Sequence, residues 1–251
     1  MPAILHPRAG DEKFRFRAPA AAPRLRPYVE HYWIVTWDLP EPYEQSVLPY
    51  PAVNMTFKAG RCRVAGVPSG RFCEVLSGAG RVFGVRFRPG GFHPFLGGPV
   101  SSITDRFVPV EDMFGPALPE AILAAGDDTA VEIMDEFLAA RAPERPDADA
   151  ELAEAIVAHS AADPGLTRVD DLAGAFGMTT RRLQRLFADY VGVGPKWVIR
   201  RHRLHEAADR VAAGESLAGL ASALGYSDQA HLTRDFRAMI GETPARYAKA
   251  Q

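Results

Sequence analysis

Cysteine and long apolar runs are both scarce in this chain of 251 residues. Its two cysteines, Cys62 and Cys73, are too few for the disulfide framework of a small secreted protein. We interpret them as buried structural thiols in a reducing compartment. No run reaches the roughly 20 apolar residues that a membrane-spanning helix needs. The opening stretch MPAILHPRAGDEKFRFR also lacks the apolar core of a secretion signal. These absences favour a cytoplasmic protein without a membrane partner.

A large excess of either charge sign is absent as well. The chain has 29 Lys and Arg residues against 31 Asp and Glu residues, which leaves a formal net charge of -2. Whole-chain charge therefore does not indicate a nucleic-acid partner, and any such indication must come from local clusters. Hydrophobic residues make up 47% of the sequence, enough for a sizeable core and, at this length, for two domains.

Residues 28–115 carry short β-branched and aromatic runs separated by glycine and proline, the pattern of an antiparallel sheet or barrel. Alternation along such runs assigns successive side chains to opposite faces. We expect one face to carry His31, Trp33, Val35 and Trp37, and we expect Phe83, Val85 and Phe87 to lie opposite Val82, Gly84, Arg86 and Arg88. The aromatic residues that we assign to the core are Trp33, Trp37 and Phe57.

The composition changes near residue 145. Apolar residues recur at helical spacing between Asp128 and Ala140, which predicts an amphipathic helix. Residues 142–149 are rich in proline and acidic side chains, the composition of a linker. Beyond them the strand pattern disappears. We therefore predict a β-rich domain at 1–142, a linker at 143–150 and a helical domain at 151–251.

The helical region contains an internal repeat. The segment 172–179, LAGAFGMT, corresponds to 220–227, LASALGYS. In each copy we interpret the pattern as a helix end, a glycine turn and a hydroxyl side chain that caps the next helix. This arrangement predicts two helix-turn-helix units. The predicted turn residues are Gly177 and Gly225, and the predicted caps are Thr179 and Ser227.

A long helix is expected between the two units. Gly194 and Pro195 are suited to open it, because proline is tolerated in the first turn of a helix, and Gly214 is suited to end it. Two DNA-reading helices on one face of a duplex should lie about one DNA turn, roughly 34 Å, apart. Local positive charge comes from Arg181, Arg182, Arg185, Lys196, Arg200, Arg201 and Arg203, opposed only by Asp189.

Residues 151–250 resemble the DNA-binding domain of AraC-type (AraC/XylS) transcriptional regulators of bacteria. The likeness rests on the run 220–237, LASALGYSDQAHLTRDFR, followed by GETP at 241–244 and by Tyr247. It implies a seven-helix domain whose two recognition helices read major grooves near a promoter, with RNA polymerase as a further candidate partner. We therefore predict an α+β fold: a β-rich N-terminal domain, with a cupin-like barrel as one form of it, and an all-α domain with two helix-turn-helix units joined by a long helix.

The resemblance also implies which side chains touch DNA. Arginine can bond guanine and glutamine can bond adenine in a bidentate manner, whereas phosphate contacts position a protein without specifying sequence. The implied base contacts are Arg181, Gln184 and Arg185 in the first unit and Gln229, Ala230 and Arg234 in the second. The candidate phosphate contacts are Thr180, Arg182, Lys196, Trp197, His231 and Thr233.

The N-terminal region resembles an uncharacterised β-rich domain found ahead of such DNA-binding domains, through VLP at 47–49, VNM at 53–55 and VFGVRFRPGGF at 82–92. By analogy it is a module that senses an effector or forms a homodimer. Arg86 and Arg88 are candidate contacts for an anionic small-molecule effector, or else outward-facing strand residues. A module that only dimerises is the alternative.

An enzyme with a DNA-targeting tail is the opposing hypothesis. It needs a nucleophile or a metal constellation, and residues 1–140 show neither. His31 and His93 lack the His-x-His pair or nearby glutamate of a cupin metal site, so we interpret them as packed or surface residues. We therefore expect no enzyme activity, no cofactor and no metal.

Overall fold

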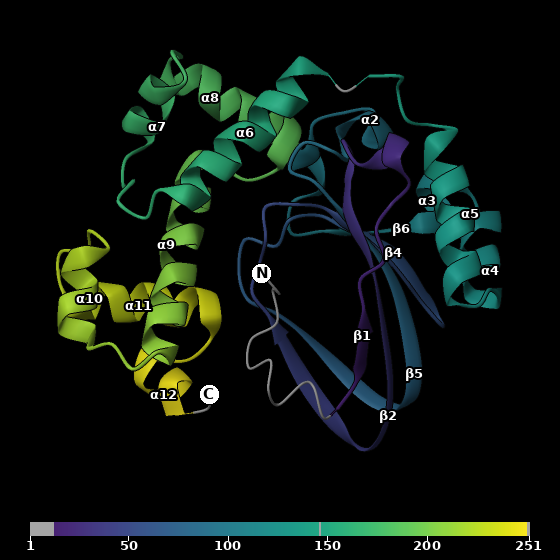
Figure 1. Cartoon of the computed structure of the whole chain (residues 1–251), viewed down its shortest axis with the longest axis horizontal. Helices are drawn as coiled ribbons and strands as arrows, with labels where there is room; N and C mark the ends of the chain where they lie inside the picture. Colours follow the sequence, from purple (N-terminus) through teal and green to yellow (C-terminus); the bar gives the residue numbers. More distant parts are fainter. Residues whose placement is uncertain (1–12, 146, 250–251) are drawn as a thin grey trace.

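The computed structural model describes residues 13–145 and 147–249, in which a β-rich first part is followed by helices (Figure 1). The α+β fold class is thereby confirmed. The expectation about a secretion signal falls mostly on residues 1–12, which lie outside the described residues.

Six strands of the described chain form one antiparallel sheet in the order β1-β2-β5-β3-β4-β6. The edge strands β1 and β6 pair with β2 and β4 and not with each other, so the sheet is open rather than a closed barrel. β2 and β5 form a long ribbon (Figure 1). The bounds are β1 Arg15–Arg17, β2 Val29–Val47, β3 Asn54–Lys58, β4 Arg61–Ala65, β5 Phe72–Phe87 and β6 Phe107–Pro109.

Alternation along the strands places the main core on one face of the sheet. This core includes Tyr32, Ile34, Met55, Phe57, Phe83, Val85 and Phe87. Trp33 lies on the opposite face, where its indole covers Gly84 so closely that a Cβ there would be 2.0 Å from the ring. Trp33 is only half-buried, so its assignment to the core is wrong. Trp37 is buried, but in a small separate cluster with Leu39 and Leu76.

Helices cover the buried face of the sheet. The predicted amphipathic helix is confirmed as α5, whose buried Ala130, Met134 and Leu138 belong to the same core as the strands. The helices of this part are α2 His93–Leu96, α3 Val110–Phe114, α4 Ala117–Ala124 and α5 Asp127–Ala139, with 3-10 turns η1 Pro23–Leu25 and η2 Val100–Ile103.

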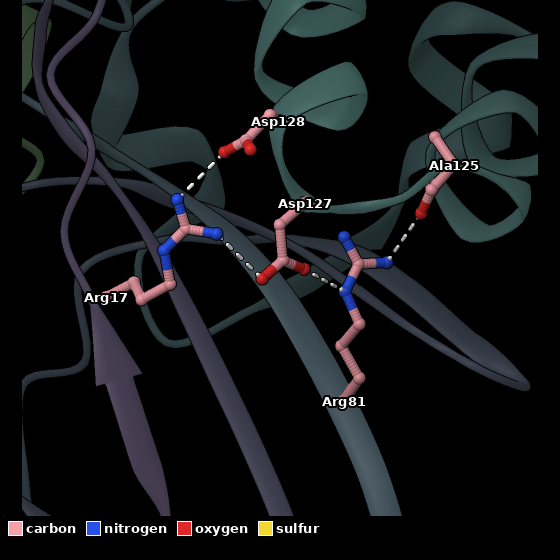
Figure 2. Close-up of polar contacts among 5 residues, drawn as sticks. All are labelled: Arg17, Arg81, Ala125, Asp127 and Asp128. Atoms are coloured by element: carbon pink, nitrogen blue, oxygen red, sulfur yellow. Dashed lines mark hydrogen bonds and ion pairs between the residues drawn. The ribbon is translucent and has the colours of Figure 1, made fainter.

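Acidic residues tie α5 to the sheet (Figure 2). The carboxylate of Asp127 accepts hydrogen bonds from Arg17 of β1 at 3.1 Å and from Arg81 of β5 at 2.9 Å. Asp128 accepts a second bond from Arg17 at 2.8 Å. Arg81 also donates to the backbone oxygen of Ala125 at 3.2 Å. The start of α5 is therefore joined to β1 through Arg17 and to β5 through Arg81.

The C-terminal part is helical throughout, and α9 runs between two smaller groups of helices (Figure 1). α7 and α8 lie towards one end of α9, and α10 and α11 lie towards the other. α6 begins at Ala148, inside the stretch expected as a linker, because the side chain of Asp147 accepts the N–H of Asp149 and caps it. The bounds are α6 Ala148–Ala162, α7 Val169–Ala175, α8 Thr180–Leu186, a π-helical turn η3 Phe187–Val191, α9 Pro195–Ala212, α10 Leu217–Ala223, α11 Gln229–Ile240 and α12 Pro244–Lys249.

Candidate nucleic-acid interface

The first helix-turn-helix unit is formed by α7 and α8. Gly177 has a φ of +61° at the turn between them, a conformation that glycine adopts without a side-chain clash. The hydroxyl of Thr179 accepts the backbone N–H of Arg182 at 3.3 Å and caps α8 as predicted. Ala173 is buried, so the two helices can cross closely. Each local feature that the repeat predicted for this unit is present.

The second unit, formed by α10 and α11, differs from the prediction at its cap. Gly225 takes a φ of +67° as expected. The cap of α11, however, is Asp228, whose carboxylate accepts the N–H of His231 at 2.7 Å. This hydrogen bond holds the pKa of Asp228 below its usual value. Ser227 instead donates its hydroxyl to Asp228 at 3.2 Å, so the assignment of Ser227 as the cap is wrong.

Both second helices keep an apolar face inside and a polar face outside. Leu183 and Leu186 of α8 are buried, as are Leu232 and Phe236 of α11. The six side chains expected to contact bases are all exposed: Arg181, Gln184, Arg185, Gln229, Ala230 and Arg234. The last three line a shallow surface hollow together with Thr233. Two polar helix faces are therefore available to a partner.

The side chains expected at phosphates have different surroundings. Arg182 and Lys196 are exposed, whereas Thr233 and His231 are half-buried, the latter against the ring of Tyr226. Thr180 donates its hydroxyl to Asp170 at 2.6 Å. Trp197 also has its donor engaged, and by the other part of the chain: its indole N–H donates to the backbone oxygen of Ser69, in the N-terminal part, at 2.8 Å. The expectation for Trp197 is corrected: that N–H is already occupied.

Three members of the predicted basic cluster do not belong to an exposed face. Arg200 forms an ion pair with Asp235 at 3.2 Å, and Arg203 donates to the backbone oxygen of Leu224 at 2.8 Å. Arg201 is only 5% exposed and donates to the oxygen of Pro49 at 2.9 Å. Burial lowers the pKa of Arg201 to about 10. The exposed members of the predicted basic cluster are thus Arg181, Arg182, Arg185 and Lys196.

The two candidate effector contacts lie where the sheet meets the C-terminal helices. Arg86 is only 9% exposed and pairs with Glu30 at 3.1 Å. Arg88 pairs with Glu154 of α6 at 2.6 Å and lines a cavity of about 220 Å³ at this junction. Glu30, Tyr50 and His202 line the same cavity. Arg86 is not among its lining residues, so the structure separates the two arginines.

The remaining candidates of the N-terminal part are packed in ordinary ways. His93 opens the short helix α2, and its ring stacks on Tyr190 with centroids 4.2 Å apart. His31 is half-buried, and burial lowers its pKa. Cys62 and Cys73 are half-buried rather than fully buried, and burial raises the pKa of Cys62. Within residues 13–145 and 147–249, no three His, Cys, Asp or Glu side chains are grouped as metal ligands would be.

Comparisons with known proteins agree with this geometry. Residues 172–250 match the family described as a helix-turn-helix domain, and residues 17–109 match a domain of unknown function. The probable transcription factor PqrA of Proteus vulgaris is 33% identical over 81 residues, which are 32% of this chain and 66% of that protein. The C-terminal part thus carries a helix-turn-helix domain. This chain therefore spans slightly less than two thirds of the length of PqrA.

Solved structures of regulators are similar to parts or most of the chain. A Chromobacterium violaceum regulator described as carrying an AraC-type DNA-binding domain is 26% identical, over 38% of this chain and 86% of that chain, with a TM-score of 0.35. A single-residue variant of ToxT from Vibrio cholerae, in its apo form, is 13% identical, over 87% of this chain and 97% of that chain, with a TM-score of 0.46. Among the described residues of this protein, no helix has the length and apolar character needed to cross a membrane.

Proposed function

We propose that the whole chain is a sequence-specific DNA-binding transcriptional regulator whose α8 and α11 enter successive major grooves of promoter DNA. One observation carries this proposal: both helices follow a positive-φ glycine and a side-chain cap, and both turn a polar face outward. α9 spans 18 residues, so it is about 27 Å long and holds the two units at a separation of the order of one DNA turn.

Base reading is assigned by side-chain chemistry. Arg181 and Arg185, and Arg234 in the second unit, are suited to bidentate bonds with guanine O6 and N7. Gln184 and Gln229 are suited to adenine, and Ala230 can contact only a thymine methyl group. Phosphate contacts that fix the register are assigned to Thr180, Arg182, Lys196, His231 and Thr233.

The N-terminal part is proposed to modulate DNA binding through an effector or through a homodimer. The cavity beside Arg88 supports the effector version, since an anionic small molecule there would compete with Glu154 of α6 for the same guanidinium. The same proposal divides the chain into domains at 1–142 and 151–251 with a linker at 143–150. It also includes contact with RNA polymerase and action in the cytoplasm, where promoter DNA is reached.

Selection of bound fragments from genomic DNA tests the function, followed by titration of one selected fragment at several salt concentrations. We expect specific sites to bind about a thousandfold or more tighter than random DNA at physiological salt, with affinity that falls steeply as salt rises. Equal binding to selected and random fragments would contradict the proposal. Sedimentation of the chain alone and with candidate anions tests homodimer formation and its response to an effector.

A further inference from the structure

Two loops of the N-terminal part each place one aliphatic side chain in the hydrophobic core of a helix-turn-helix unit. Leu48 is 3% exposed and belongs to the core of the second unit, together with Leu220, Leu232 and Phe236. Val67 is fully buried and belongs to the core of the first unit, together with Leu172, Leu183 and Phe187. We call Leu48 and Val67 the anchor residues.

Hydrogen bonds from α9 hold the same two loops. Trp197 donates its indole N–H to Ser69, two residues after Val67, and Arg201 donates to Pro49, next to Leu48. Trp197 and Arg201 are four residues apart and therefore share one face of α9. Each anchor residue thus lies beside a polar contact between its own loop and the helix that connects the two units.

The loop that carries Val67 is held rigidly from its other side. Asp105 accepts the backbone N–H and the hydroxyl of Ser69, both at 2.7 Å, and its own N–H donates to the oxygen of Val67 at 3.2 Å. Asp105 has a φ of +58°, the only positive φ of a non-glycine residue in the described chain. A residue with a Cβ adopts this backbone only at an energetic cost, which these three hydrogen bonds offset.

The loop that carries Leu48 is held by stacking. The ring of Tyr50 lies 3.9 Å from the guanidinium carbon of Arg86 on β5 and 5.0 Å from that of Arg201 on α9. Tyr50 therefore has a guanidinium of the sheet and one of the connecting helix on the same ring, which links the two parts of the chain. Prolines at positions 49 and 51 flank Tyr50 and restrict the backbone on both sides.

Both loops leave the same end of one hairpin. The first runs into β3 at Asn54, the second leaves β4 at Ala65, and these two residues are paired in the sheet. The anchor residues are consequently fixed relative to each other by a hairpin of the sheet. The two helix-turn-helix units are held by that hairpin in addition to α9.

We propose that Leu48 and Val67 are positioning residues that set the distance and rotation between α8 and α11, and so decide which spacing of DNA half-sites the protein accepts. This inference rests on the proposed function. Each anchor residue acts on one unit, and truncation of either side chain frees that unit to pivot on α9. The β-rich part then acts as a template for the DNA-reading geometry.

The first experiment measures binding of the full-length chain to selected sites in which the two half-sites are moved apart or together by two base pairs, about one fifth of a turn. We expect the natural chain to prefer one spacing by roughly tenfold. Leu48→Ala and Val67→Ala should reduce that preference to about twofold, while binding to a single half-site stays unchanged. The matched control is Met134→Ala, which removes a buried side chain from the sheet core next to α5.

The second experiment needs no DNA and therefore separates this inference from the proposed function. Spin labels are placed at the exposed repeat-equivalent positions Ala175 and Ala223, after Cys62 and Cys73 are changed to serine. We expect one narrow distance distribution in the natural background and with Met134→Ala. The distribution should broaden with Leu48→Ala or Val67→Ala and stay narrow with Leu48→Met, which keeps the side-chain volume.

Failure of this inference and failure of the proposed function give different results. An unchanged distance distribution in well-folded Leu48→Ala and Val67→Ala chains would overturn the inference, as would an unchanged spacing preference. Broadening by Met134→Ala of the same size as that by the anchor variants would also overturn it, because the effect would then reflect general loss of stability. A chain that binds no DNA specifically but shows the expected label distances would overturn the proposed function and leave the anchors supported.

Discussion

Arg200 of α9 and Asp235 of α11 form an ion pair, with Nε and Oδ2 3.2 Å apart. This pair binds the connecting helix to the second recognition helix and withdraws a basic side chain from the surface that faces DNA in our proposal. Arg203, three residues further on, lies 4.1 Å over the ring of Tyr226 and serves the same internal joint. Arginines that are neighbours in the sequence therefore divide into a DNA-facing set and a structural set.

Replacement of Arg181 or Arg200 by alanine tests that division. Arg181→Ala should weaken specific binding by about 1–3 kcal/mol and relax the base preference at one position, because it removes a base contact. Arg200→Ala should leave the salt dependence of binding unchanged and lower the free energy of unfolding by less than about 1 kcal/mol, since its pair is partly solvated. Equal losses of affinity in the two variants, measured across several salt concentrations, would contradict the division.

The cap of α11 gives a second prediction. Asp228→Ala should lower the free energy of unfolding more than Ser227→Ala does, because only Asp228 accepts a backbone N–H of the first turn. Asp228→Asn should behave nearly as the natural chain, since an amide oxygen can accept the same bond. Urea unfolding of the three variants measures the order. A larger loss in Ser227→Ala would show that serine is the cap.

The two glycine turns should differ in their tolerance of alanine. At Gly177 an added Cβ meets open space, so Gly177→Ala should cost only the backbone penalty of about 1–2 kcal/mol. At Gly225 an added Cβ would also lie 2.6 Å from the methyl carbon of Thr167, so Gly225→Ala should cost more. Urea unfolding measures both losses, and a smaller loss at Gly225 would contradict the structure.

The buried imidazole of His202 should make the free energy of unfolding depend on pH. Burial, with Arg201 as a second cause, lowers its pKa to about 3 from the ordinary value of 6.5. Below pH 6.5 the unfolded chain therefore binds a proton at this imidazole, whereas the folded chain binds it only near pH 3. The contribution of His202 to the free energy of unfolding is full above pH 6.5 and falls by up to about 1.4 kcal/mol per pH unit between these two values. His202→Gln removes this loss. The advantage of the natural chain over the variant should shrink from pH 7 to pH 4.

The charged groups near His202 fix how this experiment is interpreted. Arg201 and His205 share its helix, and Glu30, Arg88 and Glu154 line the same cavity. His205, whose pKa burial also lowers, is present in both proteins, so only its interaction with His202 differs between them. A difference in unfolding free energy that stays constant from pH 7 to pH 4 would show that His202 is not held neutral.

Local patterns predicted the parts of the site that local chemistry determines. A glycine two residues before a hydroxyl residue predicts a turn and the start of a helix, so both turns, the Thr179 cap and the exposed face of α8 follow from the repeat. The cap at Asp228 does not, because Ser227 and Asp228 are both good capping residues and only the backbone decides between them. The prediction for Trp33 is wrong because both faces of β2 carry large apolar side chains. Alternation separates the two faces of such a strand but does not show which of them is buried.

Long-range contacts account for the other errors. Arg201 and Pro49 are 152 positions apart in the sequence, and Trp197 and Ser69 are 128 apart. A count of basic residues between 178 and 204 does not show which of them turn inward. Leu48 and Val67 likewise look like ordinary loop residues in the sequence, because core partners such as Leu220 and Leu172 lie more than a hundred positions later.

Base-resolved methylation interference on a selected genomic fragment tests the central claim most directly. Two short patches of major-groove interference, centred about 10 base pairs apart on one face of the duplex, are the result expected from α8 and α11 bound together. Arg181→Ala should erase interference in one patch and Arg234→Ala in the other. A single patch that both variants abolish, or interference without any sequence preference, would contradict the account.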